Sequence, residues 1–153
     1  MKNPLHKTIA ACLLAFSLAA AALAQDGGLW RASSQAARTI TGDIAFTDHN
    51  ITINFLTFTM VRVRALTTDE VLGAFPDGGR QGAGSLYRMD ISGDRKFLHK
   101  NTLCGDENVE WMAAYISGRS LTVIFFSGQK PPVLTLDGMN NATDICGTYT
   151  YVR

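Results

Sequence analysis

The sequence has no excess of charge of either sign and no run of basic residues. Its 153 residues include 14 Lys and Arg and 13 Asp and Glu, and the two signs are interspersed along the chain. A nucleic-acid-binding domain usually gathers a basic excess on one face, and a helix that lies on a membrane usually carries a basic face. We therefore expect neither nucleic acid nor a membrane surface as the partner.

The sequence also lacks the motifs that commonly build an active site or a cofactor site. It has no G-x-S-x-G elbow, no H-x-x-x-H pair, no calcium-loop spacing and no phosphate-binding loop. After residue 24 the histidines are His49 and His99, both in polar stretches. A site using His49 with Asp48 and a serine stays open as an alternative. We expect no catalytic residue, no metal and no cofactor, and hence a protein that is not an enzyme.

Long apolar runs occur at the N-terminus and nowhere else. Lys2 and Lys7 flank the start, an apolar run covers residues 8–23, and small residues stand at the ends of Ala22-Leu23-Ala24. A basic start, an apolar centre and an A-x-A end are typical of a secretory signal. The run is roughly 16 residues, short of the ~20 that span a bilayer. We predict a cleaved signal peptide over residues 1–24.

The signal leaves residues 25–153 as one periplasmic or secreted domain without a membrane span. An alternative interpretation makes Ile9-Ala10-Ala11-Cys12 a lipobox in which Cys12 is lipidated. That interpretation leaves about four apolar residues before Cys12, which is too short for a signal core. The cleaved signal is the better interpretation.

Cysteine is scarce, with three in the chain, and Cys12 leaves with the signal. The remaining two, Cys104 and Cys146, are expected to pair, because cysteines of exported proteins usually form disulfides. Such a bond closes a loop of about 42 residues. The alternatives are a metal pair and a nucleophilic thiol, but neither cysteine has a Cys or His at metal-like spacing.

Helical periodicity is weak, and apolar side chains mostly alternate with polar ones. Ile51, Ile53 and Phe55 alternate with Thr52 and Asn54, which predicts a strand with one buried face. The same pattern or β-branched content predicts strands over 40–46, 51–55, 57–64, 86–91, 109–116, 121–126, 133–136 and 148–152. About eight short antiparallel strands indicate an all-β domain, either a small barrel or a sandwich.

Two finer predictions concern single segments. In the strand over 57–64, Val61 and Val63 are expected on one face, and Arg62 and Arg64 on the other. Residues 33–39 are expected to form one turn of helix.

Four glycines and a proline fall within residues 76–84, which predicts a loop. Loops on rigid β scaffolds often carry binding, so this loop is the candidate binding element. Its residues are Asp77, Gly78, Gly79, Arg80, Gln81 and Gly82. The alternative is a disordered connector.

Aromatic residues on the predicted strands either fill a core or form a contact patch. They are Trp30, Trp111, Tyr115, Phe125, Tyr149 and Tyr151. We expect them in the core.

Four strings carry a resemblance: Trp30-Arg31-Ala32-Ser33-Ser34, Ile40-Thr41-Gly42-Asp43-Ile44, Leu103-Cys104-Gly105 and Cys146-Gly147-Thr148-Tyr149. With them the chain resembles a group of small exported proteins of Gram-negative bacteria that carry no assigned function. In size and class it is also similar to periplasmic inhibitor domains of lysozymes and proteases, and to lipocalin-like barrels. The resemblance brings no catalytic or binding residues, and a fold does not fix a function.

Two functional hypotheses follow. The first is a small binding module of the cell envelope that contacts another protein, with inhibition of a hydrolase as one form of that contact. The alternative is a lipocalin-like carrier of a small apolar ligand, which requires an internal pocket.

Overall fold

The computed structural model describes residues 28–47 and 49–153. The predicted signal peptide, the alternative lipidation site at Cys12 and the side chain of Asp48 lie outside these residues. Within the described ranges, no helix has the length and apolarity needed to cross a bilayer.

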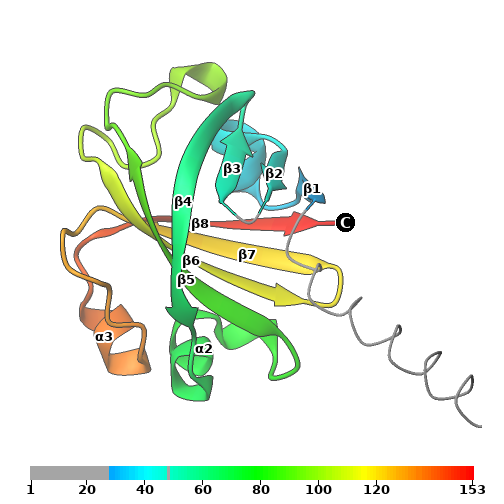
Figure 1. Cartoon of the computed structure of the whole chain (residues 1–153), viewed down its shortest axis with the longest axis vertical. Coiled ribbons are helices and arrows are strands. Elements are labelled where there is room, and N and C mark those ends of the chain that lie inside the picture. The colour runs from blue at the N-terminus through cyan, green and yellow to red at the C-terminus, as the bar shows by residue number, and fades with distance from the viewer. Residues whose placement is uncertain (1–27, 48) are drawn as a thin grey trace, which may run out of the picture.

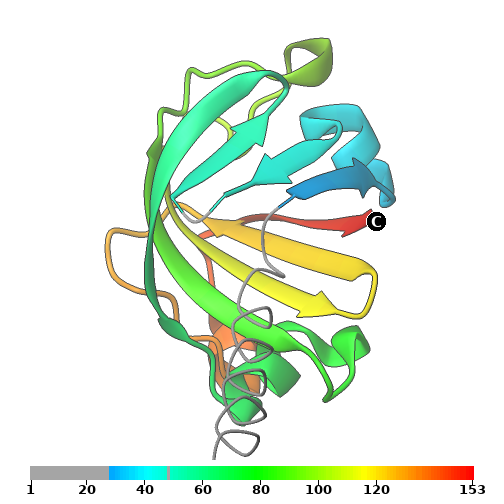
Figure 2. The ribbon, with the colours of Figure 1, turned by 45° about the vertical axis from the view of Figure 1, so that its right-hand side comes forward.

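Eight antiparallel strands close into a barrel, each pairing with the next in chain order and the last with the first (Figures 1 and 2). The strands are β1 (Gly28–Ala32), β2 (Ile44–Phe46), β3 (Asn50–Ile53), β4 (Leu56–Ala65), β5 (Ala83–Ile91), β6 (Val109–Ser117), β7 (Ser120–Phe126) and β8 (Ile145–Val152). The all-β prediction is confirmed. Closure through β1 and β8 makes the fold a barrel and not a sandwich.

Side chains of alternating strand positions fill the barrel, because successive residues of a strand point to opposite faces. On β7, Leu121, Val123 and Phe125 belong to the inner core. The outward Ile124 and Phe126 belong to a second core. This strand is almost wholly apolar because both of its faces are buried.

The second core lies outside the barrel, between the outer face of β5–β7 and a helical layer (Figure 1). That layer consists of α2 (Thr68–Ala74), η3 (Pro76–Gly78) and α3 (Leu136–Asn141). A capping box starts α2, since Thr67 and Glu70 each accept from the other's backbone N–H. The backbone of 134–136 packs so closely on Gly73 that a Cβ there would lie 2.4 Å from it.

The strand predicted over 133–136 is wrong. Pro131 and Pro132 precede it and cannot donate to a ladder, and the segment runs outside the sheet into α3. Leu134 is buried in the second core, whereas Val133 and Leu136 are exposed.

The predicted strand over 40–46 is shorter than expected, because β2 begins at Ile44. Ile40 and Thr41 belong to η2 (Ala37–Thr41), which extends the predicted helical turn and ends at Gly42, where φ is 65°. Another short helical turn, η4 (Leu98–Lys100), follows β5.

A bulge in β4 corrects the expected order of its side chains. Arg62 pairs with the inward Tyr87, but Arg64 pairs with the outward Leu86, so the register shifts between them. One extra residue, Val63, reverses the faces. The two arginines therefore point to opposite sides of the sheet and not to the same side.

The predicted disulfide between Cys104 and Cys146 is present, with the two Cα atoms 4.6 Å apart. It ties the loop that precedes β6 to the start of β8. Both cysteines pack against the inner core. The bond therefore holds the loop before β6 and the start of β8 together beside that core.

Candidate functional site

The predicted binding loop, Asp77–Gly82, is held against the barrel by one buried side chain. The hydroxyl of Tyr115 on β6 donates to the carbonyl of Gly79 and accepts from the N–H of Gly82, each over 2.8 Å. Phe75 stacks on the same ring, with the centroids 5.4 Å apart. The loop is therefore anchored at Gly79 and Gly82, which a disordered connector is not.

The glycines of this loop serve close packing. A Cβ added to Gly78 or Gly82 would lie 2.5 Å from atoms of the Tyr115 ring. No side chain fits at that distance, so the backbone must pass the ring as glycine.

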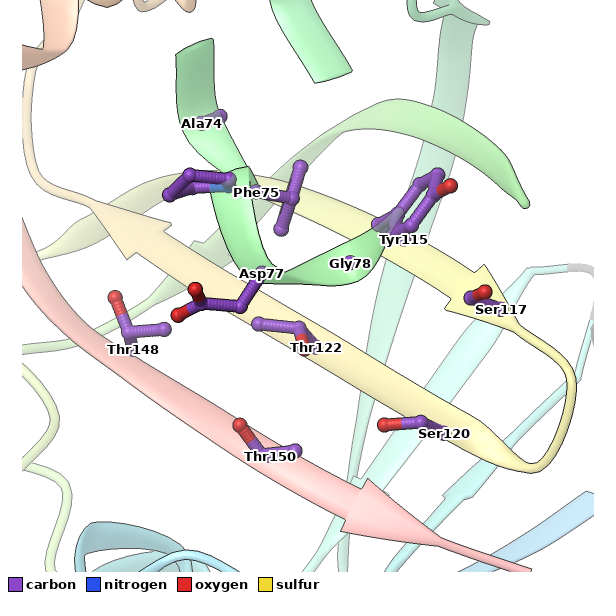
Figure 3. A pocket seen from close by; sticks show the side chains of 11 residues that line it. Ala74, Phe75, Asp77, Gly78, Tyr115, Ser117, Ser120, Thr122, Thr148 and Thr150 are labelled. Atoms are coloured by element: carbon purple, nitrogen blue, oxygen red, sulfur yellow. The ribbon is translucent and has the colours of Figure 1, made fainter. Parts of the chain in front are cut away.

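On one side of the loop lies an open groove of about 340 Å³ (Figure 3). Asp77 stands on its η3 wall, and hydroxyl side chains of β6, β7 and β8 form its floor. The floor residues are Ser117, Ser120, Thr122, Thr148 and Thr150. None of these hydroxyls has a hydrogen-bond partner in the described part of the chain, so they are available to a polar ligand or a partner's backbone.

On the other side of the loop, Arg80 and Gly82 line a second pocket of about 260 Å³. The two residues of the loop that face the groove, Asp77 and Gly78, do not line this pocket. The structure thus splits the predicted loop between two surfaces of different charge.

The turn between β3 and β4 carries a feature that the sequence pattern missed. Asn54 and Phe55 form a two-residue turn with φ of 47° and 64°, a left-handed conformation that bulky residues rarely adopt. The Phe55 side chain is 95% exposed. The prediction of Phe55 on the buried face of a strand is therefore wrong.

The sequence around this turn does carry a signal of a hairpin. Apolar residues alternate with threonine on both sides of Asn54-Phe55, and the two runs mirror each other. Mirrored alternation around a two-residue Asn-containing segment is typical of a hairpin.

Beyond the turn, the outward residues of β4 that precede the bulge are uncharged. Thr57, Thr59 and Val61 are exposed, and Val61 is 60% exposed to solvent. Thr52 and Asn50 of β3 pair with Thr57 and Thr59. We call Phe55, Thr57, Thr59 and Val61 the β4 stripe.

The alternative site of His49 with Asp48 and a serine includes a residue outside the described ones, so it stays a prediction. His49 and His99 are both exposed and lie in different loops, and His99 occupies a left-handed position within η4. Among residues 28–47 and 49–153, no group of three His, Cys, Asp or Glu side chains could hold a metal ion.

The six strand aromatics are buried, as expected for core residues. The barrel is filled in part by Trp30, Phe125, Tyr149 and Tyr151. The second core includes Trp111 and Tyr115. Burial raises the pKa of Tyr149 to about 12.

No protein-family model, curated protein or solved structure matches the chain.

Proposed function

We propose that this protein is an exported binding module that contacts another protein of the cell envelope through the β4 stripe. The observation that carries the proposal is Phe55, an aromatic side chain almost fully exposed at a strained turn. Strain of this kind persists where the surrounding structure imposes it and is common at functional sites. Buried aromatic anchors dominate the energy of protein interfaces.

The rest of the stripe suits the same role. An exposed sheet face commonly carries charged residues, whereas here Thr57, Thr59 and Val61 offer a flat surface without charge. A partner that covers this surface desolvates hydroxyls and aliphatic groups, and no unpaired charge. Phe55 at one end provides the side chain that can enter a pocket of the partner.

The packing of the barrel interior favours a protein-binding module over a carrier of a small ligand. The inner core includes Trp30, Met60 and Tyr151, each at most 1% exposed. At the mouth of the barrel, beside Phe46 and Leu121, the open volume is about 10 Å³, about that of one water. A carrier of an apolar ligand requires several hundred Å³, so the carrier is the weaker hypothesis.

Export is part of the proposal. The Cys104–Cys146 disulfide supports it, because structural disulfides persist in oxidising compartments. The intact mass of the purified protein tests it: cleavage after Ala24 leaves a chain that starts at Gln25.

The contact is tested by photo-crosslinking in the source cell. A benzoylphenylalanine replaces Phe55 or Thr59, and a matched control replaces Leu136, which is exposed on α3 at the other end of the molecule (Figure 1). Positions 55 and 59 should give the same discrete protein adduct, and position 136 should not. Adducts of equal yield at all three positions, or none at 55 and 59, would refute the proposed surface.

The finer form of the proposal, hydrolase inhibition, is tested on the captured protein. If the adduct contains a hydrolase, the purified module should inhibit it, and Phe55→Ala should abolish inhibition while Leu136→Ala leaves it intact. If the captured protein has no hydrolase activity, the result supports the binding module and contradicts the hydrolase inhibitor.

A further inference from the structure

The pocket of about 260 Å³ beside the loop combines an aliphatic wall with positive charge. Leu66, Val71 and Leu72, from the end of β4 and from α2, supply the aliphatic side. Arg62 and Arg80 are the charged residues that line the pocket, and no carboxylate lines it.

The two guanidinium groups have donors to spare. Arg62 donates from Nε to the hydroxyl of Ser85 over 3.0 Å, which orients the side chain and leaves its two terminal amino groups unused within the described residues. Arg80 makes no hydrogen bond or ion pair there.

Arg64 provides the contrast, because the bulge at Val63 turns it to the other face of β4. There it forms a bidentate ion pair with Glu70, with N–O distances of 2.7 and 2.6 Å. Of these two arginines, Arg64 is neutralised by Glu70, whereas Arg62 has no ion pair among the described residues.

We propose that this pocket binds a small aliphatic carboxylate, with the carboxylate on Arg62 and Arg80 and the alkyl group on Leu66, Val71 and Leu72. Guanidinium groups match a carboxylate through paired N–H donors. The volume lies below the roughly 300–1,000 Å³ of sites for drug-sized ligands, which indicates a ligand with a short chain. This site lies beyond the proposed contact surface and does not depend on it.

A short-chain fatty acid and the free C-terminus of a peptide that ends in an aliphatic residue both have this chemistry. Four probes separate the contribution of the carboxylate from that of the alkyl group, and a fatty acid from a peptide C-terminus. They are hexanoate, 1-hexanol, N-acetyl-leucine and N-acetyl-leucinamide. Each is titrated into the exported, disulfide-bonded protein, with amide chemical shifts recorded by NMR.

Hexanoate or N-acetyl-leucine should shift the amides of 65–72 and 80–84 with a Kd on the order of 1 mM. The uncharged probes should bind at least about tenfold more weakly, since they lack the charge-assisted hydrogen bonds. Tighter binding of N-acetyl-leucine assigns the pocket to a peptide C-terminus, and tighter binding of hexanoate assigns it to a fatty acid.

Arg62→Gln and Arg80→Gln should each weaken binding about tenfold. Arg95→Gln is the matched control, because it removes the same charge from the loop between β5 and η4, at the opposite end of the molecule (Figure 1). Because Arg80 lies in an exposed loop, its variant should fold even if Arg62→Gln does not.

Three results would overturn the assignment: no saturable shift with either carboxylate, equal binding of 1-hexanol and hexanoate, or wild-type affinity in both pocket variants. Each of these leaves the crosslinking result at Phe55 unaffected, so failure here is distinct from failure of the proposed function.

Discussion

Replacing Phe55 with glycine should make the protein slightly more stable, although it removes the largest side chain of the β3–β4 turn. A non-glycine residue in the left-handed region costs about 1–2 kcal/mol, so glycine at this position removes that strain. The greater freedom of glycine in the unfolded chain offsets about 0.5–1 kcal/mol of the gain in stability. Little packing is lost, because the ring is 95% exposed. The expected net gain is about 0.5 kcal/mol, or about 2 °C in Tm.

Phe55→Ala is the matched control for this prediction. It removes the same ring but keeps a Cβ at a φ of 64°, so it does not relieve the strain. Phe55→Gly should therefore be more stable than Phe55→Ala by about 0.5–1 kcal/mol. Urea denaturation followed by the fluorescence of the buried Trp30 and Trp111 measures the difference. If Phe55→Ala equals or exceeds Phe55→Gly in stability, the argument from backbone strain is wrong.

The same pair of variants separates stability from binding. Both remove the aromatic side chain, so both should lose the partner captured at position 59 of the β4 stripe. A more stable variant that no longer binds is the expected signature of a residue that serves contact at the expense of the fold.

Three other predictions concern the loop, the disulfide and an ion pair. Tyr115→Phe should cost about 1 kcal/mol and speed hydrogen exchange of the amides of 79–82; unchanged exchange would show that the hydroxyl does not hold the loop. Cys104→Ala with Cys146→Ala should lower the free energy of unfolding by about 4 kcal/mol in guanidinium titration, and a loss below about 1 kcal/mol would contradict it. Arg64 lowers the pKa of Glu70 from 4.5 to about 2, so its stabilisation is present above pH 4.5 and is lost as the pH falls towards 2. Glu70→Gln should remove about 1 kcal/mol of that acid dependence, since Arg64 is partly exposed; an unchanged pH profile of Tm would contradict the pairing.

The strands best predicted from the sequence are those with dense β-branched and aromatic content. Strands expected over 109–116 and 121–126 appear as Val109–Ser117 and Ser120–Phe126. The turn between them is local and marked by Gly118, whose φ is 58°. In such hairpins neighbouring residues determine both the strand and its end, so the local pattern is sufficient.

Closure and the outer layer could not be predicted in the same way. The barrel closes where Arg31 pairs with Val152, a contact between the two ends of the domain that no local period reports. α2 has seven residues, which is too short for a clear helical period. Its capping box, Thr67 with Glu70, was the signal available in the sequence.

The two wrong predictions, for Phe55 before β4 and for Arg64 within it, have a common cause and bear on the site. A strict period of two assigns every residue from Ile51 to Arg64 to a face, but the left-handed turn at Phe55 and the bulge at Val63 each interrupt that period. Both interruptions place a side chain where alternation does not: Phe55 into solvent and Arg64 onto the face opposite Arg62. Regular alternation builds the barrel core, and its interruptions expose groups that the core does not need.

β4 consequently links the two proposed sites through one strand. At its first end the exposed ring and the uncharged stripe suit a protein surface. Towards its last end Arg62 lines the aliphatic pocket, while the bulge turns Arg64 to the other face, where Glu70 neutralises it. β4 pairs with β3 over its first residues and with β5 over its last. A partner bound at Phe55 therefore contacts the part of β4 that pairs with β3, whereas a carboxylate bound to Arg62 contacts the part that pairs with β5. Because Phe55 lies at the β3–β4 turn and Arg62 lies where β4 pairs with β5, the two sites are expected to bind independently.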